Sequence, residues 1–338
     1  MTEVAIILCS SVLAFLMVEA VRRWGLRQKV LDVPNERSSH STPVPRAGGL
    51  GIVATVFVVY FIGSFVAGYP ISFGFIAGGL IVATISFIDD LRDLPFYIRL
   101  LAQSVAAALV VADIGAFNEI SYLFIDGSFS VGMLALPLTI IWILWMINAY
   151  NFMDGIDGIA GLQAFVAAAG WLAFSLLFGV GEVKWLALGV GGASIGFLIH
   201  NWSPARIFMG DVGSAFLGFL FAVLPLIALS GQPQKSGLVP VLGVLFVFPF
   251  VFDTVFTFLR RLSNREKVWK AHRSHLYQRM VIKGISHANT TLLYGGLAAV
   301  TTLVGIAVAA GIEIAGPLIL CCVPGASAVL LLMASKKR

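Results

Sequence analysis

The segment NAYNFMDGIDGIAG, residues 148–161, carries Asn or Asp at three-residue intervals between two apolar runs. The four polar residues are Asn148, Asn151, Asp154 and Asp157. Because each helical residue turns by about 100°, the four wind half-way round a helix, and one regular helix cannot direct them all to one site. Gly155 and Gly158 allow the backbone to break. An ordinary loop needs no such spacing, so we predict a helix end whose last turn and loop present these groups to a cavity.

A second segment, FIDDLRDLP at residues 87–95, also groups carboxylates. Asp89 and Asp93 are at i,i+4 and would share a helix face, with Asp90 turned about 100° away. The alternative is a solvated loop. Crowded carboxylates favour a cation between them, and Mg²⁺ combines one or two carboxylates with substrate phosphates. We therefore expect a Mg²⁺ site, with Mn²⁺ as an alternative.

A third segment, FMGDVGS at residues 208–214, has Asp211 between two glycines at the expected start of a helix. An aspartate at this position can simply cap the helix, whose dipole favours negative charge. A capping carboxylate can also hold a metal ion, so the two interpretations are compatible.

A fourth polar segment, residues 259–289, is long and basic and contains His272, Arg273 and His275. Its basic excess can simply anchor the segment on anionic lipid. Arg pairs with phosphate through two parallel hydrogen bonds, so His and Arg beside an acidic site favour a multiply phosphorylated ligand. A zinc site is not supported, because two His at i,i+3 lack further soft ligands.

The composition indicates which elements position these residues. Of the 338 residues 59% are hydrophobic and 12% charged, against about 25% charged in soluble domains, and the mean hydropathy is +0.96. We expect an all-α polytopic membrane protein in which each span has about 20 apolar residues. About eleven transmembrane helices are predicted, at residues 4–21, 49–67, 71–88, 98–115, 131–149, 158–178, 185–200, 213–230, 238–258, 290–311 and 315–334.

The distribution of Lys and Arg gives the orientation, because cytoplasmic loops collect these residues. With the N-terminus outside and the C-terminus cytoplasmic, all but two of the 22 Lys and Arg lie inside; the exceptions are Lys184 and Lys235. The basic charge therefore follows the membrane side, and no nucleic-acid partner is expected. On the outer side, Asp126-Gly127 predicts a small β-hairpin near 118–130. The three cysteines fall in apolar runs and predict no disulfide framework.

These predictions describe one integral-membrane domain, residues 1–338. All of the tight acidic groups and all five histidines map to its inner side. We expect five cytoplasmic loops to form the active site, at 22–48, 89–97, 150–157, 201–212 and 259–289.

Taken together, these loops resemble the polyprenyl-phosphate N-acetylhexosamine-1-phosphate transferases, the membrane family (glycosyltransferase family 4) that includes MraY and WecA. The matching segments are DVPNERSSHSTPVPRAGGLGI (32–52), DDLRD (89–93), NAYNFMDGIDGIAG (148–161), NWSPARIFMGDVGS (201–214) and AHRSHLYQR (271–279). They occur in the family's order and on its cytoplasmic side. The HRSHLYQR form is more similar to the WecA/WbpL branch, which starts O-antigen or related cell-surface glycans.

The resemblance implies a reaction at the cytoplasmic face of the bacterial inner membrane. A UDP-N-acetylhexosamine, or a 6-deoxy derivative, donates sugar-1-phosphate to undecaprenyl phosphate, and UMP is released. The expected metal is Mg²⁺. The resemblance leaves open the donor sugar, and whether the enzyme is a homodimer as related enzymes often are.

The resemblance also implies roles for individual residues. Asp211 is similar to the family's main metal ligand, with Asn151 and Asp154 as partners of the metal or of the diphosphate. Asp89 and Asp90 match the family's paired aspartates near the attacking lipid phosphate and are the expected catalytic residues, one of which would orient that phosphate or accept its residual proton. The residues that match substrate-binding positions are Arg99, Asn201, Phe208, His272, Arg273 and His275.

Within that set, Arg99 would contact the lipid phosphate, at a position where the family usually has Lys. Asn201 and Phe208 would line the uridine pocket, and the His and Arg residues would close over the donor. A matching first loop has no role that the sequence assigns; it contains His40, Arg46, Gly48 and Gly49.

The sequence is compatible with two mechanisms, and three other protein classes share part of its pattern. The second pKa of a phosphate monoester is about 6, so the lipid phosphate is mostly dianionic and can attack directly; the alternative is an aspartyl-phosphate intermediate. A transporter would carry its polar residues near the bilayer midplane. An intramembrane aspartyl protease would need Gly in place of Phe208. An aromatic-acceptor prenyltransferase would differ in the spacing of its aspartates.

Overall fold

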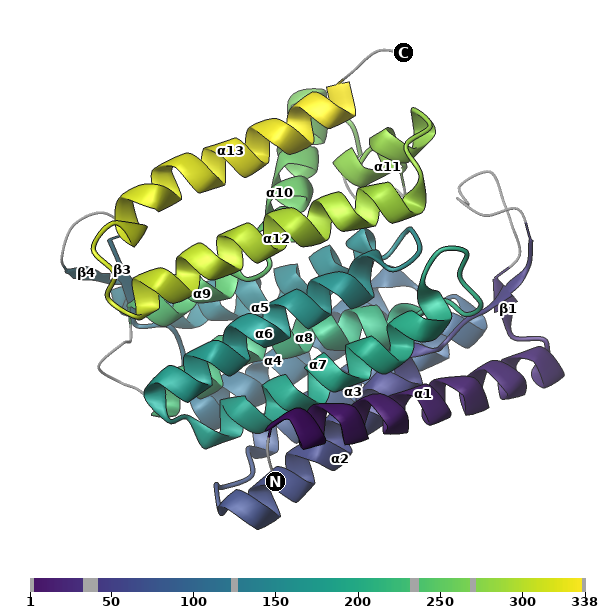
Figure 1. Cartoon of the computed structure of the whole chain (residues 1–338), viewed down its shortest axis with the longest axis horizontal. Helices are drawn as coiled ribbons and strands as arrows, with labels where there is room; N and C mark the ends of the chain where they lie inside the picture. The colour runs from purple at the N-terminus through teal and green to yellow at the C-terminus, as the bar shows by residue number, and fades with distance from the viewer. Residues whose placement is uncertain (1–2, 33–41, 123–126, 232–236, 268–271, 336–338) are drawn as a thin grey trace.

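The computed structural model describes every residue except 1–2, 33–41, 123–126, 232–236, 268–271 and 336–338. It is a helical bundle in which most helices run along one common direction (Figure 1). The longer helices are α1 (Glu3–Gln28), α2 (Gly49–Ala67), α3 (Phe73–Arg92), α4 (Phe96–Ile114), α5 (Ala135–Met153), α6 (Ile159–Phe178), α7 (Gly181–Asn201), α8 (Asp211–Gly231), α12 (His287–Ala309) and α13 (Ala315–Ser335). The shorter elements are η1 (Gly132–Leu134), α9 (Leu238–Leu245), α10 (Phe248–Ser263), α11 (Leu276–Ile282), β1 (Leu31–Asp32), β2 (Val44–Pro45), β3 (Glu119–Ser121) and β4 (Ser128–Ser130).

Ten helices in the described part of the chain are long and apolar enough to cross a membrane. The pair α9 and α10 passes the same test as one bent unit, which raises the number to eleven. The predicted all-α polytopic fold with about eleven spans is therefore confirmed. The chain is a multi-pass membrane protein, and its orientation in the membrane stays a prediction.

The predicted span at 238–258 differs from the structure, because α9 and α10 meet at an angle of 81°. Pro249 lies in the first turn of α10, where a residue without N–H is tolerated. Irregular backbone in a membrane protein must be enclosed by protein, and Phe246 and Val247 at the break are almost fully buried. An unbroken apolar run gives no signal of such a bend.

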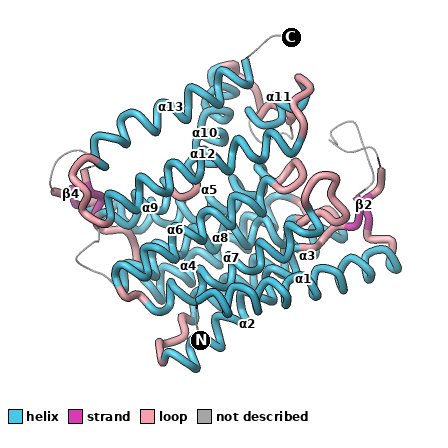
Figure 2. The backbone as a smooth tube through the Cα atoms, viewed as in Figure 1, coloured by secondary structure: helices cyan, strands magenta, loops and turns pink. Residues whose placement is uncertain are grey.

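The strands form two minimal sheets, shown in magenta in Figure 2. β1 pairs antiparallel with β2, and β3 pairs antiparallel with β4 near the position of the predicted hairpin. Asp126, which was predicted in its turn, lies outside the described residues. The position of this strand pair outside the membrane stays a prediction.

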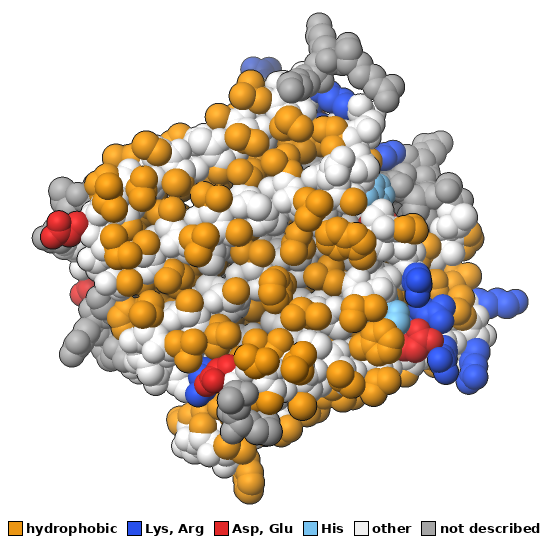
Figure 3. All heavy atoms as spheres, viewed as in Figure 1, with side chains coloured by type: hydrophobic (Ala, Val, Ile, Leu, Met, Phe, Trp, Pro, Cys, Tyr) orange, Lys and Arg blue, Asp and Glu red, His pale blue; other side chains and the backbone are white. Residues whose placement is uncertain are grey.

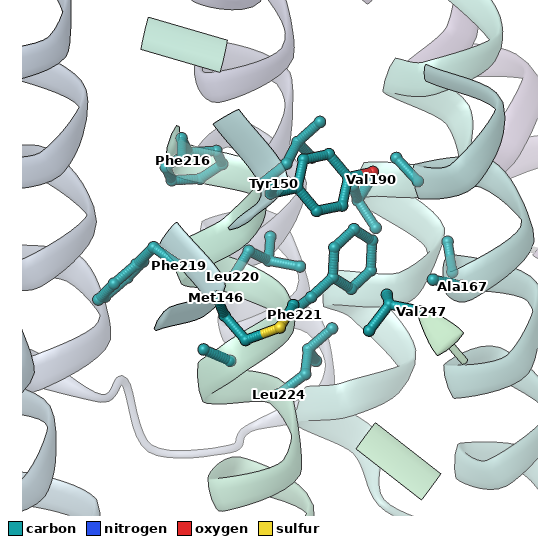
Figure 4. Close-up of a cluster of buried hydrophobic side chains, with 14 of the residues drawn as sticks. Met146, Tyr150, Ala167, Val190, Phe216, Phe219, Leu220, Phe221, Leu224 and Val247 are labelled. Carbon is teal, nitrogen blue, oxygen red and sulfur yellow. The ribbon is translucent and has the colours of Figure 1, made fainter. Parts of the chain in front are cut away.

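Helix α8 is the centre of the bundle. It packs against α3 and α5, and its residues are buried from Val212 to Ala228. Figure 4 shows part of the buried cluster of aromatic and aliphatic side chains to which it contributes, among them Phe216 and Phe221 of α8 with Tyr150 of α5. Because α8 begins with Asp211, the most buried helix carries that carboxylate at its end.

Two glycines bring the start of α2 against the start of α8. A Cβ on Gly49 would lie 2.2 Å from the Cα of Gly213, so neither position accepts a side chain without a shift of the backbone. The outer surface is different: Figure 3 shows apolar side chains along the flanks, with Lys and Arg gathered where α1 ends. This arrangement suits a helix bundle surrounded by lipid on its flanks.

Candidate active site

The ends of α3 and α8 meet through Asp90. Its Oδ1 accepts a hydrogen bond from the backbone N–H of Asp211 at 3.0 Å, and its Oδ2 accepts one from that of Val212 at 3.0 Å. These N–H groups belong to the first turn of α8, where helical donors lack partners within the helix. Asp90 thus caps α8 from a neighbouring helix and fixes the backbone that carries Asp211. The predicted place of Asp211 at a helix start is confirmed.

Arg99 of α4 joins two further carboxylates. Its Nη1 lies 2.6 Å from Oδ2 of Asp89 and 3.4 Å from Oδ2 of Asp211. The Asp211 oxygen also accepts a hydrogen bond at 3.2 Å from the Nδ2 of Asn151, whose Oδ1 accepts one at 2.8 Å from Ser214. Side chains of α3, α4 and α5 therefore gather at Asp211, which the spacing of their motifs could not establish.

Asp154 follows the last residue of α5 and occupies its C-cap position. The predicted helix end at this segment is therefore confirmed. No donor among the described residues reaches the Asp154 carboxylate. Burial, with the negative charges of Asp211 and Asp90, raises the pKa of Asp154 well above its ordinary value. We call Asp89, Asp90, Asp154 and Asp211 the carboxylate cluster.

The carboxylate cluster fits a divalent metal ion. Its four carboxyl groups are balanced mainly by Arg99, with Arg46 acting on Asp90 at longer range. In the described part of the chain, no three His, Cys, Asp or Glu side chains form a ready-made metal site. Mg²⁺ takes one or two protein carboxylates and completes its shell with phosphate oxygens and water, and its binding here stays a prediction.

One prediction about this cluster is wrong. Helix α3 ends at Arg92, and Asp93 follows it in a left-handed conformation with φ 46°. Its side chain is exposed, so Asp89 and Asp93 do not share a helix face. Asp89 and Asp90 are the buried pair instead, because successive residues at the helix end contact α4 and α8 respectively. Residue spacing alone cannot locate the end of a helix to within one residue.

Asp157 ties the loop after α5 to two other elements. It accepts a hydrogen bond from the N–H of Ala205, and His287 of α12 lies 3.3 Å away. Burial acts to raise the pKa of Asp157, but the hydrogen bond and charge of His287 outweigh it and lower the pKa. The side chain supports the loop and does not belong to the carboxylate cluster.

Asn148 and Asn201 also hold backbone in place. The amide of Asn148 donates to Gln103 of α4 at 2.8 Å. Asn201 accepts from the N–H of Gly158 at 2.9 Å and donates to the carbonyl of Ile207 at 2.8 Å. Asn201 is almost fully buried, so its side-chain amide is occupied by the two loops that it joins.

The loop before α2, to which the sequence assigns no role, has a structural role. The N–H groups of Gly48 and Gly49 donate to the carbonyls of Phe208 and Met209, and the N–H of Phe208 donates to the carbonyl of Pro45. This backbone ladder holds the segment that leads into Asp211. Arg46 belongs to the same loop, whereas His40 lies outside the described residues.

His272, Arg273 and His275 precede the short helix α11. Burial, together with the charge of His275, lowers the pKa of His272 to about 4, so its imidazole is neutral at pH 7. Arg273 is partly buried. His275 is buried, and its Nδ1 lies 3.1 Å from Oδ1 of Asp253. From α11 the Tyr277 hydroxyl donates to the carbonyl of Phe152 at 3.0 Å, which joins this segment to the loop that carries Asp154.

Sequence reasoning did not single out Asp253, a fully buried carboxylate. The available signal was one Asp within the apolar run 238–258. An ionisable residue inside a membrane-length apolar segment is expensive and therefore calls for a reason.

Residues 72–229, which include the carboxylate cluster, match the family described as "Glycosyl transferase family 4". The "Probable undecaprenyl-phosphate N-acetylglucosaminyl 1-phosphate transferase" of Bacillus subtilis (strain 168) is 30% identical over 294 residues, 87% of this chain and 81% of that protein. The chain belongs to glycosyl transferase family 4. The resemblance drawn from its loops is thereby confirmed.

Other relatives of this family 4 protein carry related names. The "Decaprenyl-phosphate N-acetylglucosaminephosphotransferase" of Mycobacterium tuberculosis (strain CDC 1551 / Oshkosh) is 27% identical over 324 residues, 86% of this chain and 79% of that protein. A "Phospho-N-acetylmuramoyl-pentapeptide-transferase" of Moorella thermoacetica is 33% identical over 140 residues, 41% of each chain.

Proposed function

We propose that this family 4 protein transfers N-acetylhexosamine-1-phosphate, or a 6-deoxy derivative, from a UDP-sugar to undecaprenyl phosphate. The products would be undecaprenyl-diphosphate-sugar and UMP. The observation that carries the proposal is the carboxylate cluster with Arg99, at one end of a lipid-facing helix bundle. The names of the Bacillus subtilis and Mycobacterium tuberculosis relatives support the polyprenyl phosphate and the N-acetylglucosamine class of donor.

The donor side of the reaction is assigned to α5, α8 and the loop after α5. Asp211, with Asn151 and Asp154, would hold Mg²⁺, and Mn²⁺ is the alternative. When bound, the metal ion neutralises charge on the donor diphosphate and on the departing UMP. Asp90 holds both N–H groups at the start of α8, so we give it the role of positioning Asp211 rather than of touching substrate.

The acceptor side is assigned to Asp89 and Arg99. A phosphate dianion brought to Arg99 can form charge-assisted hydrogen bonds with the guanidinium, in exchange for part of its contact with Asp211. Asp89 keeps its 2.6 Å contact with Arg99 and so fixes the direction of the guanidinium. Asp89 can also accept the residual proton of a lipid phosphate that arrives as the monoanion.

The chemical step is direct displacement. An oxygen of the lipid phosphate forms a bond to the phosphorus that carries the sugar, and the bond from that phosphorus to the oxygen of UMP breaks. Positioning and charge stabilisation are the main requirements of such a transfer. The alternative aspartyl-phosphate route would instead release UMP before the lipid substrate binds.

The remaining residues are assigned to the donor. Phe208 would contact uridine, and Asn201 would act through the loops at Gly158 and Ile207 that it joins. His272, Arg273 and His275 would close over the diphosphate and sugar. We place the reaction at the cytoplasmic face of the bacterial inner membrane, as the start of O-antigen or a related cell-surface glycan. In this proposal all five predicted loops contribute to one active site.

One experiment tests the proposal. The purified protein is mixed with Mg²⁺, undecaprenyl phosphate and, separately, UDP-GlcNAc, UDP-GalNAc, UDP-FucNAc and UDP-QuiNAc, and the lipid product is identified by mass. A lipid-linked diphosphosugar formed together with an equal amount of UMP supports the proposal. The absence of product with every donor contradicts it. Incubation with donor alone separates the mechanisms, because stoichiometric UMP release would overturn direct displacement.

A further inference from the structure

Asp253 lies on α10, six residues after the bend from α9, and its side chain has no exposed surface. An unpaired carboxylate at such a position would cost several kcal/mol. The donors that surround it come from three helices. They are Thr257 at 3.0 Å, His275 at 3.1 Å, the N–H of Leu276 at 2.9 Å, the N–H of Tyr277 at 3.2 Å and the hydroxyl of Tyr294 at 2.6 Å. We call this group the Asp253 centre.

Three of the five donors lie at the start of α11. Two of them are backbone N–H groups of its first turn, which Asp253 caps from α10. The third is the imidazole of His275, the residue before α11. When the ionised carboxylate accepts from Nδ1, that nitrogen carries the hydrogen and Nε2 is the nitrogen left for another partner. Asp253 therefore fixes both the position of α11 and the ring of His275.

Helix α11 in turn contacts the loop that carries Asp154. Tyr277 donates to the carbonyl of Phe152, and a Cβ added to Gly155 would lie 2.1 Å from the Tyr277 hydroxyl. Only glycine fits there without displacing α11. The chain of contacts from Asp253 through Tyr277 thus ends within two residues of Asn151 and Asp154.

We propose that Asp253 is a positioning residue that holds α11 and the preceding His272–His275 segment against the loop after α5. It acts through His275 and Tyr277 and does not itself touch substrate. This role rests on the proposed function, in which that segment and Asp154 bind the sugar-nucleotide donor. Loss of the Asp253 centre should therefore affect the donor and leave the lipid acceptor unaffected.

The test uses Asp253→Asn with Thr257→Val as the matched control. Thr257 lies one turn further along α10 and donates to the same carboxylate, and among the described residues no hydrogen bond joins its side chain to α11. Removing a group that orients a site residue lowers activity about 10- to 100-fold. For Asp253→Asn we expect kcat/KM for the UDP-sugar to fall by that factor with an unchanged KM for undecaprenyl phosphate. Thr257→Val should keep both constants.

Several results would overturn the positioning role of Asp253. Wild-type kinetics in Asp253→Asn would contradict it. An equal loss for both substrates in both variants would make Asp253 a general stability residue. If Asp253→Asn does not fold, Gly155→Ala perturbs the same contacts from the other side and should give the same donor-side loss. Normal donor kinetics in Gly155→Ala would then contradict the role.

Hydrogen exchange separates this inference from the proposed function. In Asp253→Asn, deuterium uptake should rise in residues 272–282 and 151–156 relative to wild type and to Thr257→Val. This readout does not require turnover. A wild-type protein that makes no lipid-linked product would overturn the proposed function alone. Unchanged exchange in both segments would overturn the positioning role.

Discussion

The carboxylate cluster and the Asp253 centre differ in how their carboxylates are stabilised. Both place carboxylates of a membrane protein where water is scarce. The Asp253 carboxylate has no exposed surface, and the protein supplies all of its donors. The side chain of Asp211 is 34% exposed, and Asp154 has no donor among the described residues.

The difference teaches how to separate supporting from reacting carboxylates. A carboxylate whose lone pairs are filled by fixed donors gains nothing from a further ligand, whereas crowded carboxylates without enough donors favour a cation. Asp90 illustrates an intermediate case, since both of its oxygens accept backbone N–H groups within the cluster. Position in the active site is therefore not enough to make a residue a ligand.

The largest effect on turnover should come from the carboxylate cluster, whose Asp211 is partly exposed. Asp211→Asn removes the charge expected to hold the metal, which is worth several kcal/mol, so turnover should fall about 1000-fold or more. Initial rates of UMP release measure this loss in purified protein. Asp113→Asn is the control, because Asp113 caps α3 at its opposite end through Gly74 and should keep full activity. Near-normal turnover of Asp211→Asn at ordinary Mg²⁺ would contradict the metal assignment.

Arg99 is the cation of the cluster, and its removal should have the next largest effect. Hydrogen bonds to charged groups are worth about 1.5–3 kcal/mol, so Arg99→Ala should lower kcat/KM for undecaprenyl phosphate about 10- to 100-fold. Arg99→Lys keeps the charge and should retain most of this activity. The two variants are compared at several lipid concentrations. Equal activity of Arg99→Ala and wild type would remove Arg99 from the acceptor side.

Asp157 is a second carboxylate that supports the site without belonging to the carboxylate cluster. Its substitution should have a smaller effect than that of Asp253. Because the pKa of Asp157 is lowered in the folded protein, its stabilisation is complete above the unfolded value of about 3.9 and is lost as pH falls through the folded value. Asp157→Asn should lower stability by about 1–3 kcal/mol at pH 7. Thermal unfolding at several pH values should show the gap from wild type closing in acid. A gap that widens there would refute this sign.

The smallest effect should come from Asn148, which points at α4 rather than at the cluster. Asn148→Ala removes the hydrogen bond to Gln103, a neutral contact worth about 1 kcal/mol, so turnover should fall less than about tenfold. The rate is measured beside that of Asn151→Ala. An Asn148→Ala loss as large as that of Asn151→Ala would place Asn148 among the reacting groups.

Much of this arrangement could be predicted from sequence, since it depends on local patterns. Apolar runs long enough to span a membrane locate the helices, and glycines beside Asp154 and Asp211 mark where helices end and begin. What local patterns cannot give is the partner of each polar group. The predicted turn of about 100° between Asp89 and Asp90 did not indicate that Asp90 caps α8, which is more than a hundred residues away in the chain.

The bend between α9 and α10 and the role of Asp253 escaped prediction for a related reason. An apolar run looks the same whether it is straight or broken, and Pro249 is tolerated at a helix start as well as at a bend. Apart from Thr257 of α10, the donors to Asp253 come from the start of α11 and from α12, so its hydrogen bonding depends on tertiary packing. Only the presence of one Asp within an apolar run was visible beforehand.

The most direct test of the central comparison is metal binding. Mn²⁺ is titrated into wild type, Asp211→Asn and Asp253→Asn at saturating UDP, and bound Mn²⁺ is measured by electron paramagnetic resonance. The account predicts one bound Mn²⁺ in wild type and in Asp253→Asn, and none in Asp211→Asn. Wild-type Mn²⁺ binding by Asp211→Asn would contradict it.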